Sequence, residues 1–399
     1  MNVNEVEAVF KEFENTRTDI EVTIEELKQE LLPYENRIVL YGAGSAGIAF
    51  YHYLNDAGIQ VSCFADGDAE KNGTKCEGLE VWLPQIVAQK LGKDVLIIVT
   101  INTDGKHYCR DFKKSLLEGG HEGVHEKLKN WGFLNILDYT YFQRVFQLYK
   151  GGNYNLPACA DVDLMYRSRS DILKVYDHLE DDLSKKIFVK VLTYRMLLKD
   201  TNIPTISENK QYFEWDLFPK KENEVFVDCG ACAGSSLKIF LEESGGVFSK
   251  YYGIEPDCKN FERLSEYVDE LNPIYKDKIK LVNKAAFDQE DGIAFFALGG
   301  PGAFASTNGP DHVLSIQIDS LLSGTQATYI KMNIEGSEIP ALRGAKKTIQ
   351  QFKPRLAIMG YHKTSDLWEV PLLIYQFRKD YKLKLRSYMG NVALCYYAY

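Results

Sequence analysis

The chain has 399 residues, which is longer than one ordinary domain and suits two or three. Hydrophobic residues make up 45% and charged residues 26%, a globular composition that argues against disorder. A net charge of −9 argues against a broad basic surface for nucleic acid, and the absence of an apolar run of about 18 residues argues against a membrane span.

Residues 1–32 predict N-terminal helices. Helical spacing is followed by Val6, Val9, Phe10 and Phe13, and again by Ile20, Ile24, Leu27 and Leu31, with Thr23 and Glu26 placed as a capping box. We expect these helices to pack on the following domain, with a second subunit of a homo-oligomer as the alternative. The acidic start is unlike a signal peptide, and the eight cysteines are scattered, so we expect reduced thiols and a cytoplasmic protein.

Residues 33–140 predict a small Rossmann-like βαβ domain. A strand, a Gly-rich turn and a helix follow one another in RIVLYGAGSAGIAFYHYLNDAG (37–58), and VSCFADGD (61–68) and VLIIVT (95–100) are further strands. Gly42, Gly44 and Gly47 form G-x-G-x-x-G, and Asp66 follows about 20 residues later. The pattern predicts a second nucleotide site for NAD or a nucleotide-sugar. The alternative is a scaffold whose glycines serve only packing.

The segment between the first domain and residue 223 gives weaker signals. His107, Cys109, His121 and His125 lack a convincing four-ligand spacing for zinc, so we expect a polar loop there. Residues 141–222 predict a helical connector. One apolar stripe comprises Ile172, Val175, Tyr176 and Leu179, a second comprises Ile187, Phe188, Val191 and Leu192, and NKQYFEWDLFP (209–219) leads onward.

Residues 223–399 predict one larger α/β domain. Strands are expected at 224–229, 251–256, 279–287, 328–334 and 355–360, followed by a helix around 371–377 and by strands at 382–388 and 392–399. The last two strands are joined by a short turn, Met389–Asn391, so they must be antiparallel. A parallel sheet that ends in an antiparallel hairpin is typical of a Rossmann-like methyltransferase and not of an ordinary dinucleotide dehydrogenase.

The stretch VFVDCGACAGSS (225–236) admits two interpretations. Cys229 and Cys232 form C-x-x-C, as in a redox dithiol. The same letters place Asp228 at the end of an apolar run, before a turn of small residues that contains Gly230 and Gly234. Such a turn lets backbone amides approach the anionic groups of a cofactor. We favour the cofactor loop, because Glu255 follows about 20 residues later, where a ribose-binding carboxylate belongs.

Residues 209–399 resemble the FkbM family of S-adenosylmethionine-dependent methyltransferases. The resemblance is carried by VFVDCGACAG, GIEPD, LSIQIDSLL, YIKMNIEGSEIPALRGAKKTI and PRLAIMGYH, in this order. It implies a class I methyltransferase fold and O-methylation of sugars or natural products such as macrolides. It also implies that the cofactor is surrounded by Asp228, Cys229, Gly230, Ala231, Gly234, Ser235, Glu255, Pro256, Lys284, Ala285 and Ala286, with the methionine part at Gly230, the ribose at Glu255 and the adenine at Ala285 and Ala286.

Candidate catalytic residues follow the later strands. His362 is the predicted base for a sugar hydroxyl, and Glu335 and Glu338 are predicted to orient the substrate or to act as the base. Lys331 is expected to bind an acidic substrate or to pair with Glu335. Asn333 stands where the family often has Asp, which weakens any metal site, so we expect no metal. Ser306 and Thr307 lie on a loop that could close over substrate.

Three functions compete at this point. The first is an S-adenosylmethionine-dependent O-methyltransferase that acts on a small-molecule or glycan acceptor, nucleotide-linked or part of a polysaccharide. The second is an NAD-dependent nucleotide-sugar oxidoreductase that uses the first domain, and the third is a non-catalytic binding protein of a glycan pathway. The first domain, with its FADGD and V-W-x-P elements (64–84), resembles domains of nucleotide-sugar enzymes and bacterial sugar-modifying proteins. The ordered motifs and the terminal hairpin favour the methyltransferase.

Overall fold

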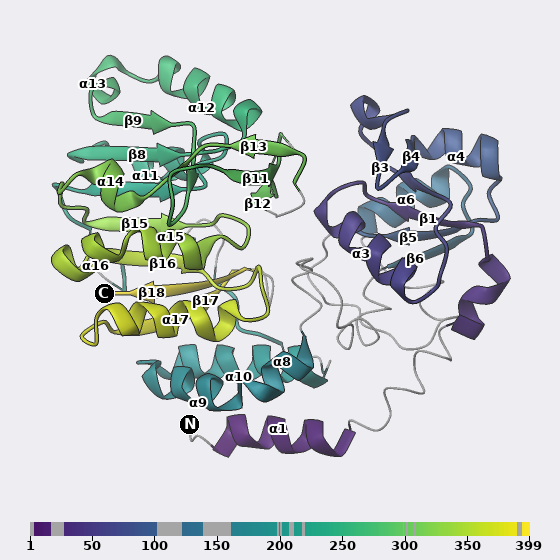
Figure 1. Ribbon diagram of the computed structural model, residues 1–399, viewed down its shortest axis with the longest axis horizontal. Coiled ribbons are helices and arrows are strands. Elements are labelled where there is room, and N and C mark those ends of the chain that lie inside the picture. The colour runs from purple at the N-terminus through teal and green to yellow at the C-terminus, as the bar shows by residue number, and fades with distance from the viewer. Residues whose placement is uncertain are drawn as a thin grey trace. The chain divides into compact units, whose positions relative to one another are not determined.

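The computed structural model describes most of the chain. The described residues are 4–16, 28–101, 122–138, 161–197, 199, 202–206, 211–217, 220–297, 299–300, 302–305, 309–388 and 393–399. The chain divides into two compact units (Figure 1), one built from residues 168–190 and 202–399, the other from residues 4–167 and 191–201. Residues 168–190 of the predicted connector thus fall in the first of these units.

The second unit contains a six-stranded sheet in the order β3-β4-β2-β1-β5-β6. Its strands are β1 (Ile38–Tyr41), β2 (Cys63–Ala65), β3 (Lys75–Cys76), β4 (Leu79–Trp82), β5 (Leu96–Val99) and β6 (Asn135–Asp138), and the short helices η2 (Leu32–Tyr34) and η3 (Ala69–Lys71) lie outside it. All neighbours are parallel except β3 and β4. Strands β1 and β5 are apolar and buried throughout, as expected for a sheet covered on both faces.

Helices cover this sheet on both faces. Helix α3 (Ser45–Asp56) contributes Phe50 and Leu54 to a core with Ile38 and Leu40. On the other face, helices α4 (Pro84–Leu91) and α6 (Glu122–Asn130) pack against the alternate strand positions, in a core that contains Val87 and Leu128. Helix α6 also contains His125, which is buried, whereas His107, Cys109 and His121 lie outside the described residues.

The predicted helices outside the sheets are present where they are described. Helix α1 (Asn4–Thr16) buries its four predicted apolar residues, and Phe10 and Phe13 contact Tyr166 of α8 (Val162–Arg167). The two connector stripes form α9 (Arg169–His178) and α10 (Asp182–Leu197), with their apolar residues buried. Of the second predicted N-terminal stripe only Leu31 is described, and it is buried in the core beneath α3.

The first unit contains a seven-stranded sheet in the order β17-β18-β16-β15-β7-β8-β9. Its strands are β7 (Val225–Cys229), β8 (Lys250–Ile254), β9 (Ile279–Val282), β15 (Tyr329–Met332), β16 (Arg355–Met359), β17 (Leu383–Ser387) and β18 (Leu394–Ala398). Strand β18 runs antiparallel to both of its neighbours, and the other pairs are parallel. The predicted parallel sheet with an antiparallel end is therefore confirmed, while its turn, Met389–Asn391, lies outside the described residues.

Helices and an aromatic core enclose this sheet. Helices α11 (Ser235–Ser244) and α12 (Cys258–Glu270) pack on one face, where Phe213, Phe226 and Tyr329 form part of the core. The remaining helices are α13 (Pro273–Lys276), α14 (Ile318–Leu322), α15 (Glu338–Gly344), α16 (Lys346–Phe352) and α17 (Asp366–Phe377). Helices α14 to α17 pack on one another, and α17 contacts β18 and α9.

One part of the first unit differs from the prediction. The segment 279–287 forms two strands, β9 and the short β10 (Ala285–Ala286), and β10 pairs with β14 (Ser315–Ile316) outside the main sheet. Between β10 and β14 the chain forms a small antiparallel sheet of β11 (Ile293–Phe296), β12 (Phe304–Ala305) and β13 (Asp311–Val313). We call residues 293–313 the insert. Its strands are too short for alternation to reveal them.

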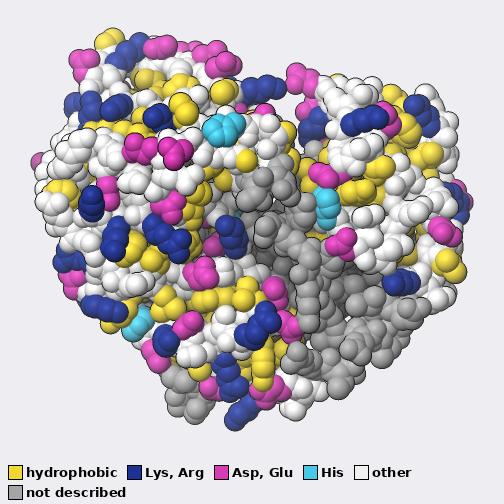
Figure 2. All heavy atoms as spheres, viewed as in Figure 1, with side chains coloured by type: hydrophobic (Ala, Val, Ile, Leu, Met, Phe, Trp, Pro, Cys, Tyr) yellow, Lys and Arg dark blue, Asp and Glu magenta, His cyan; other side chains and the backbone are white. Residues whose placement is uncertain are grey.

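The described surface is mixed in charge. Figure 2 shows acidic and basic side chains interspersed over the face that is in view. None of the described helices has the length and apolar stretch that a bilayer crossing requires.

Candidate cofactor site and active site

A glycine loop joins β7 to α11 at the carboxyl edge of the larger sheet. Gly230 and Gly234 adopt φ values of +80° and +94°, which favour glycine. A Cβ on Gly230 would lie 2.0 Å from the carbonyl oxygen of Asn333, the residue after β15. The N–H groups of Gly230 and Ala231 donate to the carbonyl of Ile254 (3.0 and 3.1 Å), so the loop is held against both neighbouring strands.

Glu255 follows β8 and fixes the same loop from the side. Its Oε2 accepts from the N–H of Cys232 (2.8 Å) and its Oε1 from the N–H of Asp257 (3.0 Å). The carboxyl group is buried, and burial raises its pKa despite these two hydrogen bonds. Glu255 forms no ion pair within the described part of the chain, and it lines the neighbouring cavity.

Asp228 and Lys331 form a buried ion pair beneath the loop. Lys331 Nζ lies 2.9 Å from Asp228 Oδ1 and donates to the carbonyl of Gly230 (2.8 Å). Asp228 Oδ2 accepts from Ser236 and from the hydroxyl of Tyr251 (2.8 Å). The predicted pairing of Lys331 with Glu335 is wrong, because the register of β7 and β15 places Lys331 beside Asp228. Both side chains are buried under the loop and support it.

The two cysteines of C-x-x-C have different surroundings. Cys229 is fully buried in β7, and burial raises the pKa of its thiol well above the ordinary range. Cys232, at φ +48°, is half-buried in the loop, and burial also raises the pKa of its thiol. A redox dithiol needs an exposed thiolate with a lowered pKa, so both shifts argue against that interpretation.

A cavity of about 640 Å³, open to solvent, lies between the loop, the end of β15 and the insert. Of the predicted site residues it is lined by Gly230, Glu255, Pro256, Ala285, Ala286, Asn333 and Glu335. The lining does not include the other predicted residues, namely Asp228, Cys229, Ala231, Gly234, Ser235, Lys284, Lys331, Glu338 and His362. Ser306 and Thr307 lie outside the described residues.

The residues of this cavity fit S-adenosylmethionine. Gly230 lines the cavity, Glu255 is a buried carboxylate without an ion pair among the described residues, and the amide oxygen of Asn333 has no hydrogen-bond partner among them. The rest of the wall is largely apolar, as a nucleoside site requires, and includes Ile293 and Phe295 of the insert.

At the β15 end of the cavity, two carboxylates flank a buried histidine. His362 Nδ1 lies 3.0 Å from Glu338 Oε1, and His362 Nε2 lies 3.4 Å from Glu335 Oε1. Glu338 also accepts from the N–H groups of Ile334 (2.9 Å) and Gly336 (3.0 Å). Glu335, at φ +52°, is about one-third exposed and faces the cavity, whereas His362 and Glu338 are buried behind it.

The proximity of His362, Glu338 and Glu335 shifts the pKa values of His362 and Glu338. Burial lowers the pKa of His362, but the carboxylates of Glu338 and Glu335 raise it by more, so that it lies well above its ordinary value. The pKa of Glu338 falls, because attraction to His362 outweighs the effect of burial. Both carboxylates therefore favour the protonated form of His362. The assignment of His362 as the base stays a prediction, and Glu335 is the carboxylate that lines the cavity.

Asp366 extends this cluster on the far side of His362. Single ligand atoms of Glu338, His362 and Asp366 lie within 4.8 Å of one another, a spacing that a metal ion would also permit. Asp366 is buried and accepts from the N–H of Lys363 (2.6 Å). Burial and the charge of Glu338 raise its pKa to about 7.

The predicted second nucleotide motif forms a glycine loop between β1 and α3 of the smaller sheet. Gly42 adopts φ +116°, and a Cβ on Gly47 would lie 1.9 Å from the carbonyl oxygen of Gly42. Gly44 has open space around it. Asp66 accepts from the N–H of Ala43 and pairs with Lys71, each at 2.9 Å. Nucleotide binding at this loop stays a prediction.

The sequence motifs missed two parts of the site. Asn260 of α12 and several residues of the insert line the cavity, although no motif pointed to them. Asn260 lies five residues after Glu255, which places it on the first turn of the helix that follows the cofactor strand. That spacing is the one signal in the sequence that would have found it.

Comparisons with known proteins place the domain in a family. Residues 228–389 match the family model of the methyltransferase FkbM domain. The crystal structure of methyltransferase FkbM from Methylobacillus flagellatus KT is similar over 99% of this chain and 100% of that chain, with 22% identity and a TM-score of 0.65, and it shows the fold. No curated protein matches the sequence.

Two further solved structures are similar over about half of the chain. The METTL16 methyltransferase domain is 14% identical, with coverage of 54% of this chain and 96% of that chain and a TM-score of 0.33. A chain of a fibrillarin/Nop5p complex is 18% identical, with coverage of 45% and 74% and a TM-score of 0.30. Scores this low support no conclusion about this chain. The family match carries the assignment: residues 228–389 of this chain are a methyltransferase FkbM domain.

Proposed function

We propose that this methyltransferase methylates a hydroxyl group of a sugar or glycan. The observation that carries the hydroxyl assignment is the Glu335 carboxylate at the cavity, backed by the buried His362–Glu338 pair. An alcohol must lose its proton as its oxygen is methylated, and a carboxylate within reach can take that proton. The sugar class is supported by the resemblance of both halves of the chain to sugar-modifying proteins.

The residues around the cavity divide the work. The cofactor supplies an electrophilic methyl group. The loop at Gly230 and the carboxylate of Glu255 hold the cofactor, and Asn333 Oδ1 offers a hydrogen-bond acceptor beside the loop. Glu335 takes the proton from the acceptor hydroxyl, while His362, fixed by Glu338, keeps Glu335 in position. Holding the acceptor oxygen in line with the methyl group supplies much of the rate enhancement.

Calorimetric titration with S-adenosylhomocysteine tests the cofactor part of this proposal. We expect binding by the wild type and its loss in Glu255→Ala, because that change removes the carboxylate that lines the cavity beside the β8 end. NAD and a nucleotide-sugar serve as parallel ligands. Binding of NAD with no binding of S-adenosylhomocysteine would move the chemistry to the smaller sheet and overturn the proposal.

Methyl transfer to a panel of sugars and nucleotide-sugars tests the acceptor part. Glu335→Gln should retain binding of S-adenosylhomocysteine and lower the transfer rate by about 10²-fold to 10⁴-fold, the usual contribution of a general base. Asp319→Asn is a control on the same domain, since Asp319 caps α16 away from the cavity. Unchanged transfer in Glu335→Gln would contradict the role of Glu335.

A further inference from the structure

Asn260 has a fixed amide orientation at the cavity wall. It is the third residue of α12, it is 2% exposed, and it lines the cavity. Its Nδ2 donates to the carbonyl of Gly300 in the insert (3.1 Å). A carbonyl oxygen accepts only from the amino side of an amide, so this bond determines which way the amide faces.

The other end of this amide has no partner. Asn260 Oδ1 is buried and makes no hydrogen bond within the described part of the chain. Leaving a buried acceptor unsatisfied costs about 1–3 kcal/mol, and most such groups in folded proteins are paired. The lining of the cavity includes the apolar residues Ala285, Ala286 and Phe295, which supply no side-chain donor. A donor on a bound ligand would satisfy Asn260 Oδ1.

The order of strands indicates which part of the ligand this is. Along the carboxyl edge, Asn333 follows β15, Gly230 follows β7 and Glu255 follows β8. Helix α12 connects β8 to β9, so Asn260 lies on the β9 side of Glu255, away from Asn333 and Gly230. With the ribose at Glu255 and the methionine part at Gly230, the base of the nucleoside lies on the side of Asn260.

We propose that Asn260 Oδ1 accepts a hydrogen bond from the exocyclic amino group of adenine and selects an adenine nucleoside at this site. This inference rests on the proposed use of the cavity for S-adenosylmethionine. The amino group is the only hydrogen-bond donor that adenine presents when it is linked to ribose. A base with a carbonyl at that position would set two acceptors against each other.

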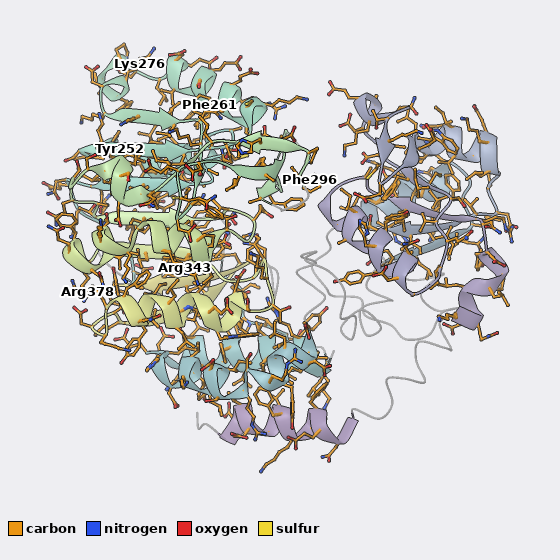
Figure 3. All side chains as sticks on the ribbon, in the orientation of Figure 1. Tyr252, Phe261, Lys276, Phe296, Arg343 and Arg378 are labelled. Atoms are coloured by element: carbon orange, nitrogen blue, oxygen red, sulfur yellow. The ribbon has the colours of Figure 1, made fainter. Side chains whose placement is uncertain are left out.

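Neighbouring contacts hold the insert loop against α12 and so hold the amide in place. Asp257 Oδ2 accepts from the N–H of Gly299 (2.9 Å), and Arg263 donates to the carbonyl of Gly299 (2.8 Å). Figure 3 labels Phe261 and Phe296, the sequence neighbours of Asn260 and Phe295, on α12 and β11. Because three side chains of the α12 N-terminal region fix this loop, Asn260 Oδ1 is oriented before a ligand binds.

Calorimetric titration of the full chain with S-adenosylhomocysteine and S-inosylhomocysteine tests the proposal. The inosyl compound has a carbonyl oxygen in place of the exocyclic amino group and carries a proton on the adjacent ring nitrogen, and the rest of the two ligands is identical. We expect the wild type to bind the adenosyl compound about 10-fold to 100-fold more tightly, since the inosyl compound leaves a buried acceptor unpaired. In Asn260→Ala the ratio should fall toward one. The ratio compares two ligands on one protein, so it does not depend on the folded fraction.

Arg263→Ala is the matched control. It removes another tie between α12 and the same loop but leaves the amide of Asn260 in the cavity wall. We expect Arg263→Ala to keep the ratio, even if both affinities fall. Asn260→Ser, with a smaller polar side chain, guards against an effect of the alanine variant on folding and should also lose most of the ratio.

Two results would overturn the proposal in different ways. Equal binding of both ligands by the wild type, or an equal loss of both in Asn260→Ala, would mean that Asn260 contacts another part of the ligand or only supports the loop. If the wild type binds neither ligand, the proposed function fails and this assignment fails with it.

Discussion

Two glycine loops, one in each sheet, use nearly the same backbone arrangement around an acid. Glu255 accepts from the N–H of Cys232 in its glycine loop and from the residue two positions further along the chain. Asp66 accepts from the N–H of Ala43 in its own loop and from Asp68, again two positions further along. In both sheets, the acid that follows the second strand of the βαβ unit (Asp66 after β2, Glu255 after β8) accepts a hydrogen bond from the glycine loop and so holds that loop against the end of the strand.

The difference lies in the charge of the two acids. Asp66 pairs with Lys71 at 2.9 Å, and although burial opposes its ionisation, its hydrogen bonds and this lysine lower its pKa. Glu255 forms no ion pair within the described residues, and burial raises its pKa although the charge of Lys331 acts in the opposite direction. The lysine of the larger sheet, Lys331, lies under the loop and neutralises Asp228 instead. In the smaller sheet, Lys71 neutralises the acid beside the glycine loop. In the larger sheet, the carboxylate of Glu255 is left to accept hydrogen bonds from the hydroxyl groups of a ligand.

The largest expected difference between the two loops is in the free energy of unfolding that is lost when Lys331 or Lys71 is replaced. Lys331→Met leaves the carboxylate of Asp228 buried without its ion pair, so we expect a loss of about 3–5 kcal/mol in the free energy of unfolding. Lys71 is 39% exposed, and Lys71→Met should cost less than about 1 kcal/mol. Urea unfolding followed by circular dichroism measures both. Similar losses in the two variants would show that burial of the Asp228–Lys331 pair does not distinguish the loops.

Glycine substitutions address the backbone of the two loops. Gly230→Ala places a Cβ 2.0 Å from the carbonyl oxygen of Asn333 at a φ of +80°, so we expect a loss of about 2–4 kcal/mol and of S-adenosylhomocysteine binding. Gly44→Ala meets no atom within 4 Å at a φ of −123°, so its cost should stay within about 1 kcal/mol. Thermal unfolding and calorimetry provide the readouts, and tolerance of alanine at 230 would remove the steric argument for that loop.

Much of the fold follows from local sequence signals. Apolar runs that end in small residues identified β1, β5, β7, β15 and β16, and the short turn after residue 388 required the antiparallel end of the sheet. These signals are local, because strand burial and turn geometry depend on neighbouring residues. The insert was missed for the same reason, since β12 has two residues and is defined by its pairing with β11.

The site was harder to predict because its chemistry depends on contacts between distant residues. Asp228 and Lys331 each stand alone in an apolar strand, and opposite charges on two central strands are a signal that they pair. The protonation of His362 depends on Glu335 and Glu338, which reach it from another strand end. The orientation of the Asn260 amide is fixed only by the hydrogen bond from its Nδ2 to the insert, which the sequence does not reveal. The spacing of motifs in the sequence located the candidate site residues, but their chemical roles depend on burial and on contacts with residues far away in the sequence.

The smallest expected effect is a difference of opposite sign in the pH dependence of the two acids. The folded pKa of Asp66 is lowered, so Asp66 contributes stability above its unfolded pKa of about 3.9, and that stability is lost as the pH falls through the folded value. The folded pKa of Glu255 is raised, so any stability linked to it is present below about pH 4.3 and is lost as the pH rises through the folded value.

Asp66→Asn and Glu255→Gln therefore test the comparison in the absence of ligand. Relative to the wild type, Asp66→Asn should lose stability as the pH rises through the folded pKa of Asp66 to about 4, and the full loss should persist above that pH. Glu255→Gln should gain stability as the pH rises from about 4.3 through the folded pKa of Glu255. Each difference should amount to about 1.4 kcal/mol for every pH unit that separates the folded and unfolded pKa values. Melting temperatures between about pH 3 and pH 8 measure the two differences. Because each variant is compared with the wild type at the same pH, titration of other groups cancels, and trends of the same sign would mean that Glu255 has a counter-charge equivalent to Lys71.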